Sequence, residues 1–408
     1  MQMKARKRGR TPIEEAVSMI VEETKGPIET ELRALADSAG YVLAGDVRAV
    51  LDQPPFTRSP LDGYALRSSD LNGAGREHPV CLPVSQYIPA GIISSGRLPE
   101  GTAARIMTGA PLPEGADCVI PQEDTDLGEH RAAFYAFIEP GRNVCFKGED
   151  IKAGESLVFA GTRLDFTHIG ILAGQGIRRV EVYKKPRVAV MATGDELLPL
   201  DKEPVPGKIY DSNGVMICAR LRELGAEADL HPIKGDAPGE LAAATERLLQ
   251  EYPLVITTGG VSVGDRDYMP AVAEMVRARI LFHGIAAKPG SPALAAVRNG
   301  RILLALSGNP FACIATLELL ARPVLAKLSG ESVWRQRQVR ARLAGSFGKP
   351  SPARRFIRAR LTGGLVSVPE KGHSSGSLKT LAGCNCLIDI PGGSGALAEG
   401  DEVKVWLF

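Results

Sequence analysis

Short aliphatic runs alternate with helical segments between residues 187 and 328 of this 408-residue chain. Ile217, Leu221 and Leu224 recur on one face of the segment 213–224, as they do in an amphipathic helix. Alternating strands and helices favour crossover connections, which make the strands parallel and cover both faces of the sheet. We therefore predict a doubly wound α/β domain. Its strands are expected at residues 187–192, 229–233, 254–258 and 302–306, and its helices at 213–224, 239–250, 270–277 and 310–328.

The segments on either side of this region have a different texture. Prolines, glycines and short apolar runs dominate residues 51–150, and the last part of the chain returns to short strands and glycine turns. Both parts are predicted to be β structure, the last one a small barrel or sandwich. One helix is expected from Thr11 onwards and another at about residues 30–39. The predicted units are an α/β domain (10–30 and 184–330), a linker domain (31–50 and 151–183), a β-rich arm domain (51–150) and a C-terminal β domain (331–408).

Composition and charge narrow the class of protein. The chain has 49 basic and 47 acidic residues, and this near-balance argues against a nucleic-acid-binding protein that relies on overall positive charge. No apolar run approaches the roughly 20 residues of a membrane span, and no apolar core follows the basic residues 1–10. We therefore expect a cytoplasmic protein. The seven cysteines are scattered, and Cys384 and Cys386 have no second close pair or histidine nearby to complete a zinc site.

Acidic residues follow three of the predicted parallel strands. Asp195 and Glu196 come after the first, Asp236 after the second, and Asp265 and Asp267 after the third. Ligands of open α/β sheets bind at the carboxyl ends of the strands, so these carboxylates are expected to converge there. Hard oxygen ligands suit Mg²⁺ beside a phosphate group. The alternative is that each residue caps a helix or faces water.

Glycine-rich loops at the same predicted edge point to an anion. The loop 257–264 precedes a helix, so that its backbone N–H groups and the helix dipole could hold a phosphate. Lys288 opens another rigid loop, and Pro310 starts a helix. Taken alone, such loops are equally well explained as turns and caps. The candidate ligand-binding residues of this edge are Asp211, Asn213, Gly259, Gly260, Ser262, Gly264, Lys288, Gly308, Asn309 and Pro310.

Three further polar positions lie in the β-rich region. Asp62 occupies an exposed-looking turn, Thr108 precedes a glycine, and Asp150 ends the region. Each of these residues, taken singly, is more often structural than functional. The six histidines do not pair at metal-binding spacing, and the chain has no GxSxG, P-loop or HExxH motif, which disfavours hydrolase and nucleotide-kinase functions.

Taken together and in order, the motifs resemble those of the molybdopterin molybdenumtransferase family, which includes a domain of gephyrin. The resemblance covers nearly the whole chain, whereas any one motif would be weak evidence. The matching segments are SPLDGYA (59–65), RIMTGAPLPEGAD (105–117), KGEDI (147–151), ATGDEL (192–197), GKIYDSNG (207–214), TTGGVSVGDRDY (257–268), KPG (288–290), GNP (308–310) and SSGSL (374–378).

The resemblance implies an activity and an assembly. Family members insert molybdenum from molybdate into adenylylated molybdopterin with Mg²⁺ and release AMP. They are elongated homodimers, with a molybdopterin-binding α/β domain, a β-rich domain that reaches toward the partner's cleft, and a C-terminal β barrel. The linker domain would then also serve dimerisation, and contact with other molybdenum-cofactor enzymes would be expected.

The resemblance also assigns roles to residues of this chain. The implied metal ligands are Asp195, Glu196, Asp236 and Asp267. The implied catalytic residues are Asp62, Thr108, Asp150, Glu196, Asp236 and Asp267. The ligand-binding residues given above would be joined by Ser375, which with Lys288 would approach the oxyanion or the ligand phosphate.

Three loops depart from the family pattern. The usual KPGKP has Ser291 in place of its second lysine, PGNPVS becomes SGNPFA with Ser307 and Ala312, and NVRxRGED has Cys145 where an arginine is usual. Losing a cation and a hydroxyl would weaken the binding of a dianion. The replacement charge could come from Arg354, Arg355 or Arg358.

Three functions therefore stay open. The chain is an active molybdenum-insertion enzyme, or a diverged paralogue, or an interaction scaffold without turnover. The paralogue would bind molybdopterin or a partner enzyme without efficient insertion, or would use another oxyanion such as tungstate. A redox role of Cys145 is also left open.

Overall fold

The computed structural model describes residues 10–261, 268–333 and 337–408, and the chain divides into two compact units. The first unit contains residues 1–45, 160–169 and 179–408, and the second contains residues 46–159 and 170–178. Within the described residues, no helix is both long and apolar enough to cross a membrane.

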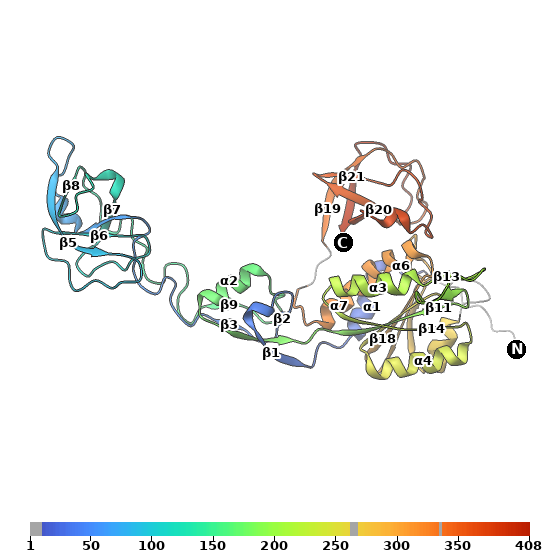
Figure 1. The fold of residues 1–408 in the computed structure, drawn as a ribbon. Helices are drawn as coiled ribbons and strands as arrows, with labels where there is room; N and C mark the ends of the chain where they lie inside the picture. Colours follow the sequence, from blue (N-terminus) through green and yellow to red (C-terminus); the bar gives the residue numbers. More distant parts are fainter. Residues whose placement is uncertain (1–9, 262–267, 334–336) are drawn as a thin grey trace. The chain divides into compact units, whose positions relative to one another are not determined.

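A six-stranded sheet forms the centre of the first unit (Figure 1), in the order β14-β11-β15-β18-β17-β16. The first four strands are parallel, as the alternation of strands and helices predicted. They are β14 (Glu227–Lys234), β11 (Arg187–Thr193), β15 (Leu254–Thr258) and β18 (Arg301–Leu306).

Two antiparallel strands at one edge of this sheet were not expected from the sequence. β16 (Arg279–His283) pairs with β17 (Leu294–Arg298), which in turn pairs with β18. Asn299 and Gly300 have φ values of 55° and 78°, the left-handed conformation of a two-residue hairpin. A hairpin this short can only join antiparallel neighbours, so the sheet is mixed rather than wholly parallel.

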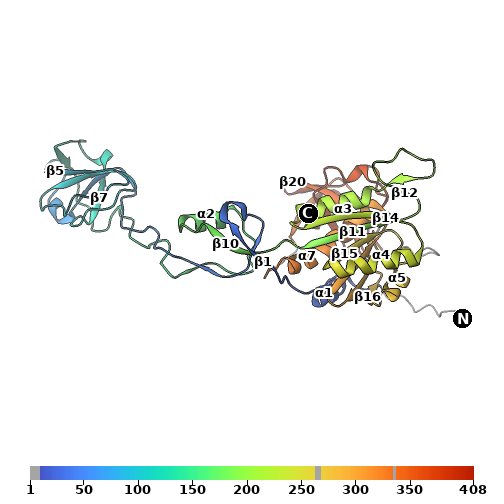
Figure 2. The ribbon, with the colours of Figure 1, turned by 60° about the horizontal axis from the view of Figure 1, so that its bottom comes forward.

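Helices cover both faces of the sheet (Figures 1 and 2). α1 (Ile13–Glu23), α3 (Ser212–Glu223), α6 (Pro310–Thr316) and α7 (Arg322–Leu328) share a core with Val188 and Val190. α4 (Pro238–Glu251) and α5 (Met269–Met275) pack on the opposite face, against Ala189 and Met191. The even and odd residues of β11 thus face different layers, which explains why the whole strand is apolar.

The helix predicted from residue 310 to 328 is interrupted in its middle. The π-helical segment η4 (Leu317–Ala321) separates α6 from α7. It presents Glu318, whose side chain is only 3% exposed, to Arg220 at 2.6 Å and Arg322 at 3.1 Å. Arg322 also donates a hydrogen bond to the carbonyl oxygen of Leu407. We refer to the six-stranded sheet with its covering helices as the α/β body. The charge network thus connects the α/β body to the last strand of the chain.

The helix predicted near residues 30–39 is wrong. The segment forms β1 (Thr30–Ala34) followed by the short 3₁₀ helix η1 (Leu35–Asp37). β1 pairs over five residues with β10 (Arg179–Tyr183), and β10 also pairs with β2 (Val42–Leu43). The partner strand lies about 150 residues away in sequence, so tertiary pairing has overridden a local pattern that suited a helix.

The C-terminal residues form a closed five-stranded barrel in the order β19-β21-β20-β22-β23, which confirms the predicted barrel. Phe356, Leu387 and Trp406 of this barrel belong to the core of the α/β body. Its strands are β19 (Gln338–Ala344), β21 (Leu365–Ser367), β20 (Arg355–Thr362), β22 (Cys386–Ile390) and β23 (Glu402–Leu407), with the 3₁₀ helix η5 (Lys379–Leu381).

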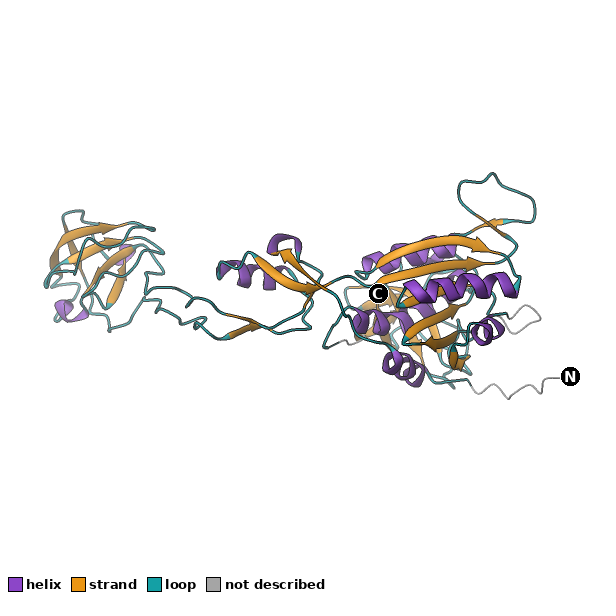
Figure 3. Cartoon of the chain, turned by 90° about the horizontal axis from the view of Figure 1, so that it is seen from below, coloured by secondary structure: helices purple, strands orange, loops and turns teal. Residues whose placement is uncertain are grey.

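The second unit consists mainly of strands and loops (Figure 3), as predicted for the β-rich region. Its five-stranded sheet has the order β7-β4-β6-β5-β8 and surrounds a core that includes Tyr64 and Phe134. The strands are β7 (Cys118–Pro121), β4 (Gly63–Leu66), β6 (Ala103–Ile106), β5 (Val80–Ile88) and β8 (Arg131–Phe134).

The remaining elements are short. β3 (Val47–Arg48) pairs with β9 (Ser156–Val158), and β12 (Leu197–Leu198) pairs with β13 (Ile209–Tyr210). Two 3₁₀ helices, η2 (Ser68–Leu71) and η3 (Gln122–Asp124), lie in the second unit, and α2 (Phe166–Gly174) begins in the first unit and ends in the second.

Replacing Glu318 tests the charge network at η4. Glu318→Ala leaves Arg220 and Arg322 in a poorly hydrated site without their shared carboxylate, so we expect a loss of about 3–5 kcal/mol in the free energy of unfolding. Urea denaturation of the full-length protein measures this loss in the unfolding transition of the first unit. The control is Glu402→Ala, which removes an exposed pair with Arg340 and should cost about 0–1 kcal/mol. Equal losses in the two variants would contradict a stabilising role of the network.

Candidate functional site

The loop after β15 contains two glycines, and the neighbouring backbone leaves no room for a side chain at the first of them. Gly259 has a φ of +102°, and a Cβ at this position would overlap the carbonyl oxygen of Thr193 at the end of β11. Gly260 follows with a φ of +63°. The carboxyl ends of adjacent strands are therefore in close backbone contact. Ser262, Gly264, Asp265 and Asp267, which the sequence placed in this loop, lie outside the described residues.

A buried polar network supports this loop from below. The Asn213 amide donates hydrogen bonds to the hydroxyl of Thr258 (3.1 Å) and the carbonyl oxygen of Gly308 (2.7 Å), and the Thr258 hydroxyl donates to the carbonyl oxygen of Ser307 (3.1 Å). Asn213 Oδ1 is buried and accepts no hydrogen bond from the described protein groups. It is thus an acceptor available to a ligand N–H group.

Asp211 has a structural task at the start of the same helix. Its carboxylate accepts a hydrogen bond from the backbone N–H of Gly214 (2.8 Å) and caps α3. The residue is only 5% exposed. For this carboxylate, the alternative of a helix cap is the one that the geometry favours.

At the ends of two strands, the side chain of one predicted acidic residue contacts the backbone of another. Asp195 Oδ1 accepts a hydrogen bond from the backbone N–H of Asp236 (3.1 Å), and Lys208 donates to the carbonyl oxygen of Asp195. Glu196 is the next residue and is exposed. We refer to Asp195, Glu196 and Asp236 as the acidic edge. Over the described ranges, no three Asp, Glu, His or Cys residues are close enough to hold a metal ion together.

A cavity of about 280 Å³ lies where the α/β body meets the barrel, and we refer to it as the cation pocket. Among the described residues, its lining contains four Lys or Arg side chains and no carboxylate. The lining residues are Lys288, Pro289, Phe311, Phe347, Lys349, Arg355, Phe356, Ile357, Arg358, His373 and Ser375. The predicted residues Lys288 and Ser375 are among them, as are Arg355 and Arg358, two of the three arginines that the sequence offered as a replacement charge.

Backbone hydrogen bonds fix the loops around this pocket. Lys288 N–H donates to the carbonyl oxygen of Arg354 (2.9 Å), and Phe356 N–H donates to that of Lys288 (2.7 Å). Phe311, in the first turn of α6, donates from its N–H group to the carbonyl oxygen of Ser375 (2.9 Å). The loop 288–290 is thereby joined to the start of β20, and the start of α6 is joined to the loop 372–378.

Arg358 carries the buried charge of the pocket. It is 1% exposed, and its guanidinium donates only to backbone carbonyl oxygens, those of Gly372, Ser374 and Ser377. No carboxylate lies at ion-pair distance from it within the described part of the chain, and burial lowers its pKa. A desolvated cation without a counter-charge favours a bound anion.

The imidazole of His373 is surrounded by the same positive charges. Burial lowers the pKa of its imidazole, and the positive charges of Lys349 and Arg358 lower it further. Its ring packs edge-on against Phe347, with the centroids 5.5 Å apart. The neutral imidazole and the cations around it form a site suited to a small oxyanion.

The departures from the family pattern have identifiable structural consequences. The Ser291 hydroxyl donates to the carbonyl oxygen of Ile285 (3.0 Å) and does not line the cation pocket. Ala312 is 2% exposed, and the Ser307 hydroxyl accepts from the N–H of Asn309, the N-cap residue of α6 (3.3 Å). None of these side chains offers a cation to the pocket.

One of the three arginines considered as a replacement is excluded. Arg354 binds both carboxylate oxygens of Asp389 at 2.8 Å and also pairs with Glu14 at 2.7 Å. Arg355 and Arg358, in contrast, line the pocket.

In the second unit, Asp62 and Thr108 come together. Both the N–H and the hydroxyl of Thr108 donate to Asp62 Oδ1 at 2.7 Å, and these donors lower the pKa of the carboxyl group. Asp62 is thus ionised at neutral pH. Asp150 lies on another loop, exposed, where its N–H donates to the carbonyl oxygen of Gln53 (3.0 Å).

Cys145 does not have the environment of a reactive thiol. Its backbone pairs in both directions with Arg58, and burial together with a hydrogen bond to Glu149 raises the pKa of its thiol. A raised pKa leaves less thiolate at neutral pH, and the thiolate is the reactive form.

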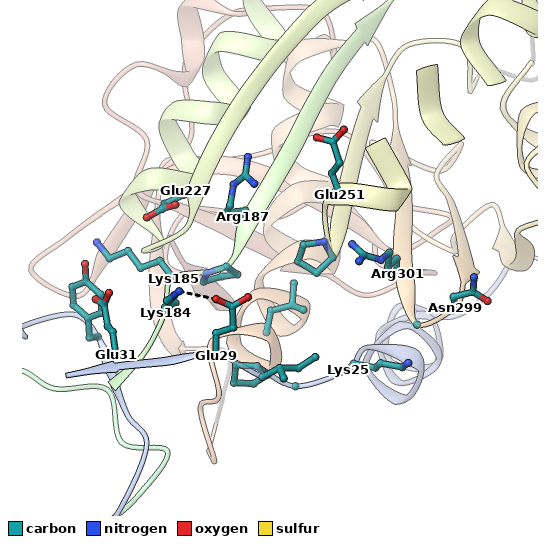
Figure 4. A pocket seen from close by; sticks show the side chains of 18 of the residues that line it. Lys25, Glu29, Glu31, Lys184, Lys185, Arg187, Glu227, Glu251, Asn299 and Arg301 are labelled. Carbon is teal, nitrogen blue, oxygen red and sulfur yellow. Dashed lines mark hydrogen bonds and ion pairs between the residues drawn. The ribbon is translucent and has the colours of Figure 1, made fainter. Parts of the chain in front are cut away.

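A larger cavity, of about 750 Å³, lies at the opposite ends of the strands (Figure 4). Arg187 and Arg301, the first residues of β11 and β18, line it. Its charges are mixed, and two ion pairs are already formed there, Lys184–Glu29 at 2.6 Å and Arg33–Glu31 at 2.7 Å. In this larger cavity, carboxylates therefore balance much of the positive charge, unlike in the cation pocket.

Comparisons with known proteins agree along the whole chain. Three family models match in order: the MoeA N-terminal region (domain I and II) over residues 11–176, the probable molybdopterin binding domain over 189–327, and the MoeA C-terminal region (domain IV) over 340–408. A molybdopterin molybdenumtransferase from Staphylococcus epidermidis is 38% identical over 403 residues, which cover 98% of this chain and 96% of the relative.

Solved structures are similar over the same length. A molybdopterin biosynthesis MoeA protein from Pyrococcus horikoshii is 34% identical, with a TM-score of 0.81, and covers 98% of this chain and 99% of its own. A second one from this organism is 29% identical, with a TM-score of 0.85, and covers 98% of this chain and 100% of its own.

The pair of Asp62 and Thr108 allows a test by pH titration. Thr108→Val removes the hydroxyl donor but keeps the backbone N–H, so we expect the pKa of Asp62 to rise part of the way toward its ordinary value. Carboxyl NMR titration measures it. Because the folded pKa is depressed, Asp62 stabilises the folded unit above the ordinary pKa, and this contribution is lost as the pH falls through the folded pKa. The acid-induced loss should be smaller in the variant.

Thr102→Val is the control, since the Thr102 hydroxyl donates to the carbonyl oxygen of Pro99 (2.8 Å) rather than to Asp62. An unchanged pKa of Asp62 in Thr108→Val would show that the hydroxyl does not stabilise the carboxylate.

Proposed function

Because this chain belongs to the molybdopterin molybdenumtransferase family, we propose that it inserts molybdenum from molybdate into adenylylated molybdopterin, with Mg²⁺, and releases AMP. Members of this family are transferases of molybdenum cofactor biosynthesis. The finer parts of the proposal are the adenylylated substrate, the metal ion, the working dimer and the roles of individual residues.

The cation pocket is the observation that carries this proposal. It gathers Lys288 from the α/β body and Arg358 from the barrel around a cavity without a carboxylate. Molybdate is a dianion, and charge-assisted hydrogen bonds from fixed cations are the main source of affinity for such a group. The buried Arg358 is preorganised because three backbone carbonyl oxygens hold its guanidinium.

The glycine loop and its polar support suit the pterin ligand. Gly259 and Gly260 allow close approach of the backbone, and Asn213 Oδ1 is an acceptor to which no described residue donates. Gly308, Asn309 and Pro310 lie at the start of the seven-residue helix α6. This helix contributes to the pocket through the hydrogen bond from the Phe311 N–H to the carbonyl oxygen of Ser375. We propose that the pterin and its phosphate bind between the glycine loop and the cation pocket.

We further propose that Mg²⁺ binds at the acidic edge and is completed by Asp267. Asp195 and Asp236 are hard oxygen ligands on neighbouring loops, joined by the hydrogen bond from the Asp236 N–H to the Asp195 carboxylate, but the described residues do not form a full ligand set by themselves. When bound, Mg²⁺ would neutralise charge on the phosphoryl linkage. Asp62 and Thr108 of the second unit, with Asp150, would act as catalytic residues across a homodimer.

A diverged paralogue is the second candidate, because the loop departures are real. Ser291 binds to its own loop, and Ala312 is a buried methyl group. Such a protein would bind molybdopterin without efficient insertion, or would use tungstate.

The two functions are distinguished by AMP release. Purified protein is mixed with adenylylated molybdopterin and Mg²⁺, and AMP is followed with molybdate, with tungstate and without oxyanion. AMP formation that depends on molybdate supports the enzyme. Tight pterin binding without AMP would leave only the paralogue, and faster release with tungstate would change the assigned substrate. Light scattering of the same sample tests the dimer.

Asp236→Ala tests the acidic edge. We expect the Mg²⁺-dependent rate of AMP release to fall by more than about a hundredfold, since losing a direct ligand costs more than losing a supporting group. The oligomeric state and the circular dichroism spectrum should not change. Asp201→Ala, at an exposed position in the nearby loop, is the matched control. Wild-type turnover in Asp236→Ala would remove this carboxylate from the metal site.

A further inference from the structure

Two cations of the pocket come from the outer wall of the barrel and are not engaged in ion pairs. Lys349 is exposed, and Arg355 is partly buried. In the described ranges, neither makes an ion pair with a carboxylate, and the polar contact of the Arg355 side chain is a long one, 3.5 Å to the carbonyl oxygen of Pro350. The neighbouring Arg354, in contrast, forms ion pairs with Asp389 and Glu14.

The position of Arg355 in the fold is fixed. Its backbone forms a bridge with Lys288, between the hydrogen bonds that join Lys288 to Arg354 and Phe356. Its guanidinium lies 5.7 Å from the centroid of the Phe347 ring, which also lines the cavity. Arg355 and Lys288 therefore stand side by side on the same pocket, one from the barrel and one from the α/β body.

The loop 288–291 itself supplies only one cation to this pocket. Ser291 turns its hydroxyl to the carbonyl oxygen of Ile285, and the first turn of α6 contributes Phe311. A dianion held by Lys288 and the buried Arg358 alone would have no charged group on the outer side of the cavity. Arginine suits this place, since its planar guanidinium donates two parallel hydrogen bonds to an oxyanion.

We propose that Arg355, assisted by Lys349, binds the oxyanion directly and sets the affinity of the cation pocket, taking the place of a second lysine in the loop 288–291. This inference rests on the oxyanion role proposed above for the pocket. It assigns the barrel a part in substrate binding that goes beyond holding the loop 372–378. In this proposal, part of the positive charge at the oxyanion site comes from strand β20 instead of from the loop 288–291.

The test is calorimetric titration of the full-length protein with molybdate, and with sulfate for selectivity. Arg355→Gln should weaken molybdate binding about ten- to hundredfold, as expected for a hydrogen bond between charged groups. Lys349→Gln should weaken it about two- to fivefold, as for an exposed ion pair. The matched control is Arg360→Gln, which removes the same charge from an exposed position on the same strand, outside the pocket, and should leave the affinity within about twofold.

Three readouts separate direct binding from a structural role. The dependence of the affinity on salt should become shallower in Arg355→Gln, and the KM for molybdate should rise while kcat at saturating molybdate changes little. Ser291→Lys in the Arg355→Gln background should restore affinity. Arg355→Lys, which keeps the charge but not the planar fork, should fall between the wild type and Arg355→Gln.

The outcomes are distinct from those of the proposed function. A wild-type protein that does not bind molybdate overturns the oxyanion role of the pocket itself. A wild-type protein that binds molybdate, with Arg355→Gln binding equally well, overturns this inference and leaves the proposed function standing. Failure of Ser291→Lys to restore any affinity would overturn the idea that Arg355 replaces a loop cation.

Discussion

The backbone joint between the loop 288–290 and strand β20 is the interaction on which the candidate site depends. Two hydrogen bonds, from Lys288 N–H to Arg354 and from Phe356 N–H to Lys288, attach the barrel to the α/β body. Phe356 and Trp406 continue this joint into the shared hydrophobic core. The cation pocket exists because both parts contribute walls at this joint, so a displacement of the barrel would open the pocket and disturb the shared core.

Charge is segregated within the first unit, and the segregation matches two different ligands. The acidic edge has Asp195 and Asp236 after β11 and β14, where we propose that Mg²⁺ binds. The described lining of the cation pocket contains no carboxylate, and its cations together with burial lower the pKa of His373. Like charges are thus gathered at two separate places, at a cost in repulsion that a bound metal ion and a bound oxyanion would relieve. An arrangement selected for stability alone would have mixed the signs, as the larger cavity with its two ion pairs does.

The sequence predicted the parts of the fold that depend on local pattern, and it failed where distant strands decide. The parallel strands β11, β15 and β18 were predictable because strands buried on both faces read as apolar runs, and β14 was predicted as well although it is a partly exposed edge strand with charged residues. The segment 30–39 was not, because its strand depends on pairing with β10, far away in sequence. The edge strand β16 and its neighbour β17 were missed although Asn299-Gly300 is a hairpin signal. The loops that carry Asp195 and Asp236 lie in contact through the Asp195 carboxylate and the Asp236 N–H, because the topology brings these two strand ends together.

The sequence offered three barrel arginines as a replacement charge but could not choose among them. Arg354, Arg355 and Arg358 are near neighbours in the chain, and only the three-dimensional structure shows that the first is neutralised by Asp389 and Glu14. Charged and apolar residues alternate along most of strand β20, but alternation does not say which face of a strand meets another domain.

The loop departures are best understood as a redistribution of charge that respects a packing constraint. Gly290 lies so close to Thr316 that a Cβ would overlap its side chain, and the Thr316 hydroxyl is bound to the carbonyl oxygen of Ala312. The loop and the first turn of α6 are therefore locked together, and Ser291 tightens the loop further through Ile285. Within such a rigid frame, a cation can be supplied from the barrel without rebuilding the loop, because β20 already runs alongside it.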